Sequence, residues 1–415
     1  MKLLRMALRN TMRNKRRFAI TTVSILFAVF VSTMLRGMIK EVQGELKRSI
    51  TDTQTGDLQM FRKGYSKSLD TSPLDLRIAT NSPEVELVKE VQGIEAVASR
   101  LKFTGMISNG GQSTPFVAIA YNPETLLNVC PEYASNIKWG KSLDTSDMDG
   151  IVVSEQLAKS FGLKQNDRLT LLARTAHGGL NTASVKVKGA FTQMMMGDKG
   201  IIYSHIETGR RLLGLENEAT EVIIRINKHE DMETIKKRLE IKAGEAGHEV
   251  EFLTWLEIMT FFKNVMSIQN VMIMVVSAIL FFLVTSTVIN TIQMSVFERM
   301  KEIGMMKALG MKSGQLIMLF VHEGVIYGVA GGLAGLLLSQ VVVTIIGGFG
   351  GLVYTFPMRF GAAEPWYVIP RITPMFRVVA LALAVATGII ASIYPARKAA
   401  KLKIVDTLHK RLLYK

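Results

Sequence analysis

The chain has 415 residues, is 48% hydrophobic and carries a formal net charge of +15, with a mean hydropathy of +0.24. An average this apolar excludes an ordinary soluble enzyme and indicates a membrane protein. The basic excess alone would also suit nucleic-acid binding. Beside four apolar runs that can each span a bilayer, however, we expect membrane contact and no nucleic-acid partner.

Residues 1–17 form the first predicted element, a basic amphipathic helix. Basic and apolar residues recur side by side at helical spacing: Lys2, Arg5, Arg9 and Arg13, and Leu4, Leu8 and Met12. Such a helix is suited to lying on an anionic cytoplasmic leaflet as an elbow, although a solvated start is the alternative. The uncharged run Phe18–Leu35 then predicts a first transmembrane helix over 18–39. No Ala-x-Ala site follows it, which favours an uncleaved anchor over a signal peptide.

Residues 40–265 alternate between short β-rich runs and helical patterns. The predicted strands are 57–61, 115–121, 150–154, 168–173, 183–191, 199–204 and 221–226, and the predicted helices are 83–91, 155–161, 205–213, 231–243 and 254–266. This alternation predicts a large α+β domain outside the membrane. Because the single cysteine, Cys130, cannot form an internal disulfide, the core must hold this domain together. We expect that thiol to react with an impermeant reagent if it is solvent-accessible.

The sequence shows no catalytic or metal-binding pattern. The six histidines have no metal-ligand spacing, and no Gly-x-Ser-x-Gly elbow is present. The "GKS" at 140–142 ends like a P-loop, but Ser135 stands where the first glycine of that motif should be. The methionines at 194–196 lack a histidine partner and are better explained as a flexible apolar contact loop than as a copper site. We therefore expect no catalytic residue, no metal and no cofactor bound by this chain.

The second half of the chain predicts three more spans, at 266–294, 315–346 and 376–395, with a charged loop at 295–314, an external loop at 347–375 and a basic tail at 396–415. Seven Lys/Arg precede residue 18 and seven follow residue 396. By the positive-inside rule both termini and the charged loop are then cytoplasmic, and the large domain is external. The predicted fold class is an integral membrane protein of four transmembrane helices with a large α+β extracytoplasmic domain.

The charged loop has a pattern of its own. Ile303, Met306 and Leu309 form one apolar stripe at helical spacing, with charge beside it, and Gly310 is placed to end the helix. A solvated connector would not need that stripe. The pattern therefore predicts a short cytoplasmic helix that docks on another protein.

The stretch "ERMKEIGMMKALGMKSGQL" at 298–316 resembles the signature of permeases in the FtsX, MacB and LolC/LolE group of ABC transporters. The signature falls on Glu298, Arg299, Glu302, Ile303, Gly304, Lys307, Ala308, Leu309 and Gly310. The stretches 321–339 and 394–408 are similar to the third span and the closing segment of that group. The stretches 152–172 and 187–214 are similar to a MacB-type periplasmic core, so the resemblance extends over nearly the whole chain.

The resemblance implies a permease that pairs with a second copy or a paralogue and binds two copies of a stand-alone ABC ATPase. The 295–314 loop would be the coupling helix, and the partner ATPase would bind ATP and Mg²⁺. The residues expected at the ATPase contact are Glu298, Arg299, Glu302, Ile303, Met306, Lys307, Ala308, Leu309 and Gly310. The expected location is the bacterial inner membrane, with the MacB-like domain, residues 40–265, in the periplasm.

The layout most resembles LolC/LolE, which implies lipoprotein release from the inner membrane, with a lipoprotein or a periplasmic carrier as a further partner. One departure is the loop at 174–183, which is short and proline-free where a LolC pattern would carry the hook for its carrier. A MacB-like efflux permease is the alternative. A membrane-anchored receptor or adhesion protein without an ATPase is the alternative from another class.

The third span carries small residues at four-residue spacing, which lets helices approach closely in lipid. They are Gly324, Gly328, Gly331, Gly332 and Gly335. Glycine is also common in spans without a packing role. Glu323 stands near the start of this span, and we expect it beside the lipid headgroups rather than in contact with a substrate.

Overall fold

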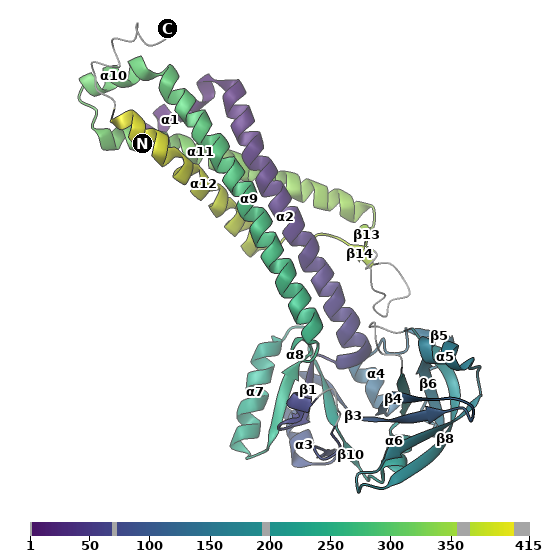
Figure 1. Cartoon of the computed structure of the whole chain (residues 1–415). Helices are drawn as coiled ribbons and strands as arrows, with labels where there is room; N and C mark the ends of the chain where they lie inside the picture. Colours follow the sequence, from purple (N-terminus) through teal and green to yellow (C-terminus); the bar gives the residue numbers. More distant parts are fainter. Residues whose placement is uncertain (1, 69–72, 193–199, 355–365, 402–415) are drawn as a thin grey trace. The chain divides into compact units, whose positions relative to one another are not determined.

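The computed structural model describes residues 2–68, 73–192, 200–354 and 366–401, which divide into two compact units (Figure 1). The helical unit comprises residues 1–43, 265–353 and 367–415, and the α/β unit comprises 44–264 and 354–366. The boundary between residues 43 and 44 falls inside a single helix, α2. The methionines at 194–196 and residues 402–415 of the predicted basic tail lie outside the described residues.

The helical unit contains four helices that are long and apolar enough to cross a membrane. Its elements are α1 (Lys2–Arg13), α2 (Lys15–Ile50), α9 (Thr260–Glu298), α10 (Met300–Ala308), α11 (Ser313–Gly348), α12 (Pro374–Ala400) and the strand pair β13 (Leu352–Tyr354) and β14 (Trp366–Val368). The predicted spans 18–39, 266–294, 315–346 and 376–395 each lie inside one long helix. These helices continue beyond the predicted spans because backbone hydrogen bonding does not stop where the apolar run ends.

Glycines let α11 lie against α12 on one face and against α2 on another. A Cβ atom on Gly324 would meet the carbonyl oxygen of Gly388 at 2.2 Å, and one on Gly328 would meet the Ala384 carbonyl at 2.7 Å. On the adjoining face, a Cβ on Gly331 would lie 2.5 Å from the Ile25 side chain. The other two predicted glycines follow the same division, Gly332 towards Leu381 of α12 and Gly335 towards Leu26 of α2. Backbones this close leave no room for any side chain at these positions.

Hydroxyl groups add polar contacts between the spans. The Thr33 and Ser339 hydroxyls lie 2.6 Å apart between α2 and α11, and those of Thr21 and Thr291 lie 2.8 Å apart between α2 and α9. Such bonds stabilise helix association where apolar burial supplies little driving force.

The α/β unit is built on a ten-stranded sheet in the order β12-β1-β11-β3-β4-β9-β6-β8-β5, with β7 paired to β3 and β8. The strands are β1 (Leu58–Arg62), β3 (Ile94–Ser108), β4 (Ser113–Tyr121), β5 (Ile137–Gly140), β6 (Gly150–Ser154), β7 (Arg168–Arg174), β8 (Leu180–Phe191), β9 (Ile201–His205), β11 (Glu221–Ile226) and β12 (Val250–Thr254). A separate short pair joins β2 (Ile78–Ala79) to β10 (Glu218–Ala219). The helices are α3 (Pro83–Glu90), α4 (Pro123–Val129), α5 (Glu155–Phe161), α6 (Ile206–Leu213), α7 (Met232–Glu245) and α8 (Trp255–Ile258), with a 3-10 turn, η2, at Tyr65–Ser68.

Two separate hydrophobic clusters pack against the sheet, one at the end formed by β12, β1 and β11 and one around β3, β4, β9 and β6. Leu58 and Val222 pack with Val88 of α3 and Leu239 of α7, whereas the cluster around Phe103 includes residues of α5 and α6. The strands are antiparallel except for β4 with β9 and β6 with β8. This arrangement agrees with the predicted α+β architecture.

Several local predictions for the α/β unit were wrong or incomplete. The 15-residue strand β3 was not predicted, and the predicted helix at 254–266 is interrupted at Met259, between α8 and α9. The loop predicted at 174–183 is present but shorter, at 175–179, where it joins β7 to β8 in a hairpin, because Arg174 still belongs to β7 and β8 begins at Leu180. Cys130 is fully buried, and burial raises the pKa of its thiol to about 11, so we expect the folded domain to protect it from thiol reagents.

The glycine contacts lead to a first prediction. Gly324→Ala forces a methyl group against the backbone of Gly388, so we expect a loss of about 1–3 kcal/mol of stability from overpacking. Gly314→Ala, in the same helix, is the matched control because a Cβ there meets nothing within 4 Å. It should leave the protein unchanged or stabilise it by about 0.4–1 kcal/mol. Thermal unfolding in detergent measures both variants, and equal midpoints for the two would contradict the packing described here.

Candidate functional site

The charged loop folds as α10, a short helix set between two corners of the chain. Arg299 has non-helical backbone angles (φ −104°, ψ 18°) and separates α9 from α10. Gly310 has φ +94°, which lets the chain turn sharply after α10 before α11 begins at Ser313. The motif therefore supplies both the helix and the corners that orient it.

A buried ion pair joins the first corner to α11. Arg299 Nη1 lies 2.9 Å from Glu323 Oε1, and the two side chains are only 7% and 2% exposed. Asn10 of α1 donates a further hydrogen bond to the same carboxylate oxygen, at 3.3 Å. Glu323 therefore lies inside the helical unit, and the prediction that it would sit beside lipid headgroups was wrong. A buried carboxylate needs such partners because desolvation of an unpaired charge is costly.

Glu302 extends this contact to the surface of the unit. Its two carboxylate oxygens accept from Arg13 Nη1 at 2.8 Å and from Arg299 Nε at 3.0 Å. The hydrogen bond from Arg13 is the main cause that holds the pKa of the Glu302 carboxyl below its ordinary value, with Arg299 adding to it against a counteracting effect of burial. We refer to Asn10, Arg13, Arg299, Glu302 and Glu323 together as the Arg299 network.

Two further contacts fasten the ends of this region. Arg17 Nη2, near the start of α2, lies 2.5 Å from Glu298 Oε1 at the end of α9. Lys307 Nζ donates to the backbone carbonyl of Ala400, at the end of α12, at 2.9 Å. Glu298, Arg299, Glu302 and Lys307 thus all contact other elements of the same helical unit.

The apolar stripe predicted for docking is divided between the interior and the surface. Ile303 is fully buried in the core of the helical unit, and Met306 packs against that core, whereas Leu309 is 83% exposed. The prediction of one exposed stripe was therefore wrong for Ile303, which other residues of this chain already cover. Periodicity places a residue on a face of the helix but does not say which neighbouring helix covers that face.

A different face of α10 is open. Lys301, Met305, Ala308 and Leu309 are exposed at helical spacing, and Met305 is 59% exposed. Lys301 and Met305 were missing from the sequence-based set, although their spacing from Leu309 was available as a signal. We refer to these four residues as the docking face.

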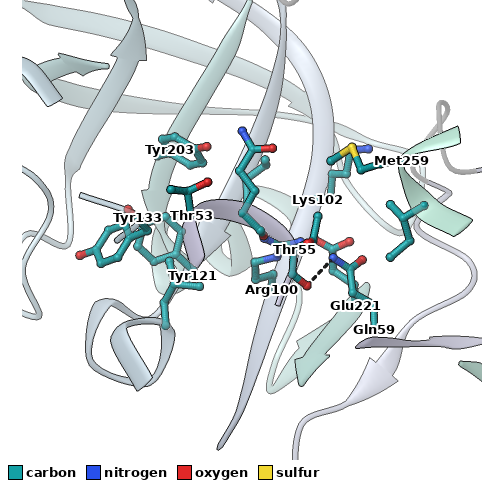
Figure 2. Close-up of a pocket in the computed structure, with 14 residues that line it drawn as sticks. Thr53, Thr55, Gln59, Arg100, Lys102, Tyr121, Tyr133, Tyr203, Glu221 and Met259 are labelled. Atoms are coloured by element: carbon teal, nitrogen blue, oxygen red, sulfur yellow. Dashed lines mark hydrogen bonds and ion pairs between the residues drawn. The ribbon is translucent and has the colours of Figure 1, made fainter. Parts of the chain in front are cut away.

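The α/β unit has a hollow of about 270 Å³, drawn in Figure 2. Tyr121, Tyr133 and Tyr203 lie on one side of it, and Arg100 and Glu221 lie on the other. Arg100 Nε lies 2.8 Å from Glu221 Oε1, and the same guanidinium donates to the Gln54 carbonyl. That carbonyl belongs to η1 (Thr51–Thr55), the π-helical turn that ends α2.

Arg100 therefore satisfies a backbone carbonyl at the end of α2, where a helix leaves such groups without intrahelical partners. Arg225 holds the same turn through a side chain, because its Nη1 lies 2.8 Å from Asp52 Oδ1. The same nitrogen donates to the Val129 carbonyl at the end of α4, at 2.8 Å. The Cys130 thiol completes the set by donating to the Thr51 carbonyl at 3.4 Å. Arg100 therefore both lines the hollow and anchors the turn that ends α2 within the α/β unit.

Within the described ranges, no group of three or more His, Cys, Asp or Glu side chains is placed to hold a metal ion. The described site consists of charged and apolar contacts between helices, with the docking face left exposed.

Comparison with known proteins gives the family. Residues 18–242 match the model of the MacB-like periplasmic core domain, and residues 274–404 match the model of the FtsX-like permease C-terminal domain. An uncharacterized ABC transporter permease of Methanocaldococcus jannaschii is 24% identical over 333 residues, which cover 78% of each chain. The macrolide export ATP-binding/permease protein MacB of Neisseria gonorrhoeae is 36% identical over 121 residues, which cover 29% of this chain and 16% of MacB.

Among solved structures, the periplasmic region of MacB from Actinobacillus actinomycetemcomitans is similar at a TM-score of 0.37 and 14% identity, covering 51% of this chain and 95% of that one. The family models cover both units of the chain. Four candidate transmembrane helices and a MacB-like α/β domain define an ABC transporter permease. The chain belongs to the MacB/FtsX type of these permeases.

The buried pair leads to a second prediction. Arg299→Ala leaves the Glu323 carboxylate buried without its main partner, so we expect a loss of about 3–5 kcal/mol of stability. Arg13→Ala removes an ion pair whose side chains are 59% and 45% exposed, and should cost about 0–1 kcal/mol. Unfolding of the purified protein in detergent by thermal or SDS titration gives both values.

A paired substitution serves as the control for the buried charge. Because Arg299→Met with Glu323→Leu replaces both charges by apolar groups, it should recover most of the stability that Arg299→Ala loses. A double variant as unstable as Arg299→Ala would contradict a role for the unpaired carboxylate.

Proposed function

We propose that this chain is the permease subunit that transmits ATPase-driven motion from a cytoplasmic ATPase to its own α/β domain. The observation that carries the proposal is the docking face of α10. Two apolar side chains, Met305 and Leu309, are exposed on a helix whose opposite side is fastened to the rest of the unit. An exposed apolar pair with a lysine beside it is suited to a protein contact at the membrane surface.

The Arg299 network supports the next step. It joins α10 to α1 through Arg13 and to α11 through Glu323. A push on the docking face would therefore move α1 and the start of α11 together with α10. Lys307 would carry the same displacement to the end of α12.

The anchors at the end of α2 support the last step. The helix begins at Lys15 in the helical unit and ends at Ile50 in the α/β unit, where it continues into η1. In that turn, Arg100 binds the Gln54 carbonyl and Arg225 binds Asp52. A helix held by buried side chains at its far end can transmit displacement without slipping. A receptor or adhesion protein without an ATPase would need neither these anchors nor the docking face.

The proposal includes partners and a location. The 415 residues contain no P-loop, so ATP and Mg²⁺ would be bound by a separate ABC ATPase, in two copies, beside a second permease that is either identical or a paralogue. We place both termini and α10 in the cytoplasm and the α/β domain in the periplasm of a bacterial inner membrane. The basic residues that flank the first and last spans support this orientation.

For the cargo we propose lipoprotein release, on the likeness of the layout to LolC/LolE, with a lipoprotein or a periplasmic carrier as a further partner. MacB-like efflux is the second candidate, and it is supported by the matches to macrolide exporters. In either case, the chain would supply the moving domain while its partner supplies the hydrolysis.

The docking face leads to a third prediction. Met305→Asp and Leu309→Asp each place a charge in the proposed apolar contact, and we expect each to reduce co-purification of the ATPase and Mg²⁺-dependent ATP hydrolysis by at least tenfold. Ile241→Asp is the matched control, because Ile241 is an equally exposed (60%) apolar residue on α7 of the α/β unit. This control should retain normal co-purification of the ATPase and normal Mg²⁺-dependent ATP hydrolysis.

Normal hydrolysis and co-purification in both α10 variants would contradict the proposed coupling and the cytoplasmic position of α10. In cells that carry Met305→Asp, lipoproteins retained in the inner membrane support the first cargo. Normal lipoprotein release with lost macrolide efflux supports the second.

A further inference from the structure

A group of cations lies at the end of the helical unit away from α10. Arg36 and Lys40 of α2 and Arg371, which precedes α12, border a hollow of about 490 Å³. Met375, Phe376 and Val379 of α12 add apolar surface to its lining, which also includes Thr373. Arg36 is 21 positions after the first residue of α2, which corresponds to about 30 Å along a helix, so this site is separate from the Arg299 network.

The backbone holds these cations together. The Arg371 amide donates to the Gly37 carbonyl at 3.2 Å, which fixes the segment before α12 against α2. A Cβ on Gly37 would lie 3.2 Å from the Pro370 side chain, so only a small residue allows this approach. The Arg36 guanidinium lies 5.7 Å from the centre of the Phe376 ring, in a cation–π contact. The cluster is therefore built by tertiary contacts between segments far apart in the sequence.

The described residues give this cluster no ion-pair partner. Over the described parts of the chain, no carboxylate lies within 4 Å of the charged groups of Arg36, Lys40 or Arg371. Arg377, one turn into α12, donates to the neutral Gln340 side chain at 2.7 Å and adds a further positive charge. Three or four cations in one place repel one another unless an anion lies between them.

The cluster lies where the apolar part of the spans ends. Arg36 directly follows the uncharged run Phe18–Leu35, and Arg377 directly precedes the uncharged run that begins at Val378. Beside the cations, Met375 is 74% exposed and Val379 is 37% exposed. Basic side chains that border exposed apolar surface match a ligand with an anionic head and a hydrocarbon tail.

We propose that this cluster binds the headgroup phosphate of an anionic phospholipid at the end of the spans opposite α10. The phosphodiester lies between Arg36, Lys40 and Arg371, since arginine forks and lysine ammonium groups both bind phosphate oxygens. An acyl chain of the same lipid follows the exposed face of α12 at Met375 and Val379. A lipid without net charge is bound less well because its ammonium group faces the same cations.

Native mass spectrometry of the detergent-purified full chain, titrated with phosphatidylglycerol or phosphatidylcholine, tests this site. The elbow also carries cations, so every protein in the test carries Arg5→Gln and Arg9→Gln. In that background, Arg36→Gln, Lys40→Gln and Arg371→Gln together should weaken the tightest phosphatidylglycerol binding at least fivefold. Phosphatidylcholine should bind weakly and equally with and without the three substitutions.

Two control variants distinguish a loss at this site from a general effect of removing positive charge and from misfolding. Lys141→Gln with Lys164→Gln and Lys237→Gln makes the same charge change at exposed positions of the α/β unit and should leave lipid binding unchanged. Arg36→Lys with Arg371→Lys keeps the charges and should retain binding within twofold, which excludes misfolding as the cause of a loss. Unchanged phosphatidylglycerol binding in the triple variant, an equal loss in the α/β control, or displacement by millimolar inorganic phosphate would each overturn the proposal. The last result would assign the site to free phosphate.

Discussion

The buried ion pair between Arg299 and Glu323 is the interaction on which the helical unit most depends. Both side chains are almost fully removed from solvent, so each is stable as an ion only while the other is present. The pair fixes the corner between α9 and α10 to the neighbouring helix α11. Through Glu302 and Asn10 the same corner is bound to α1. A short helix that could otherwise lie anywhere on the membrane surface is therefore held in one orientation.

Under the proposed mechanism, the close packing of the helical unit would transmit movement of α10 to the other helices. Gly324 and Gly328 bring α11 into backbone contact with α12, and Gly331 brings it against α2, so displacement of α11 cannot be absorbed by compressible side chains. In the α/β unit, the buried Arg100 binds the Gln54 carbonyl and Arg225 binds the Asp52 side chain, both in the turn η1 that ends α2. The contacts at the two ends of α2 are thus of different kinds. Small residues allow close packing in lipid, and charged groups with full hydrogen bonding hold the helix end in the folded domain.

The sequence predicted the four spans, because long apolar runs and their flanking charges identify transmembrane helices without knowledge of how the helices pack. The short helix at 298–310 and the α+β domain also followed from spacing and composition. Spacing and composition did not predict which side of α10 faces outward. Ile303 and Met305 lie on different faces of one short helix and are both apolar, and only the packing of the other helices determines which of them is covered. Glu323 was misplaced for the same reason, because its partner Arg299 is 24 residues earlier and reaches it only through the fold.

The claim that α1, α10 and the start of α11 move as one body can be measured directly. Spin labels at Arg9→Cys and Lys301→Cys lie on exposed positions of α1 and α10, and the native Cys130 is buried. In the proposed complex of two permeases with the ATPase, pulsed electron–electron double resonance with and without a non-hydrolysable ATP analogue reports two distances. One joins the two labels within one permease, and the other joins the Lys301→Cys labels of the two permeases. The account predicts that nucleotide changes the distance between permeases and leaves the distance within each permease the same. A change in the distance between Arg9→Cys and Lys301→Cys within one permease, or no change between permeases, would contradict it.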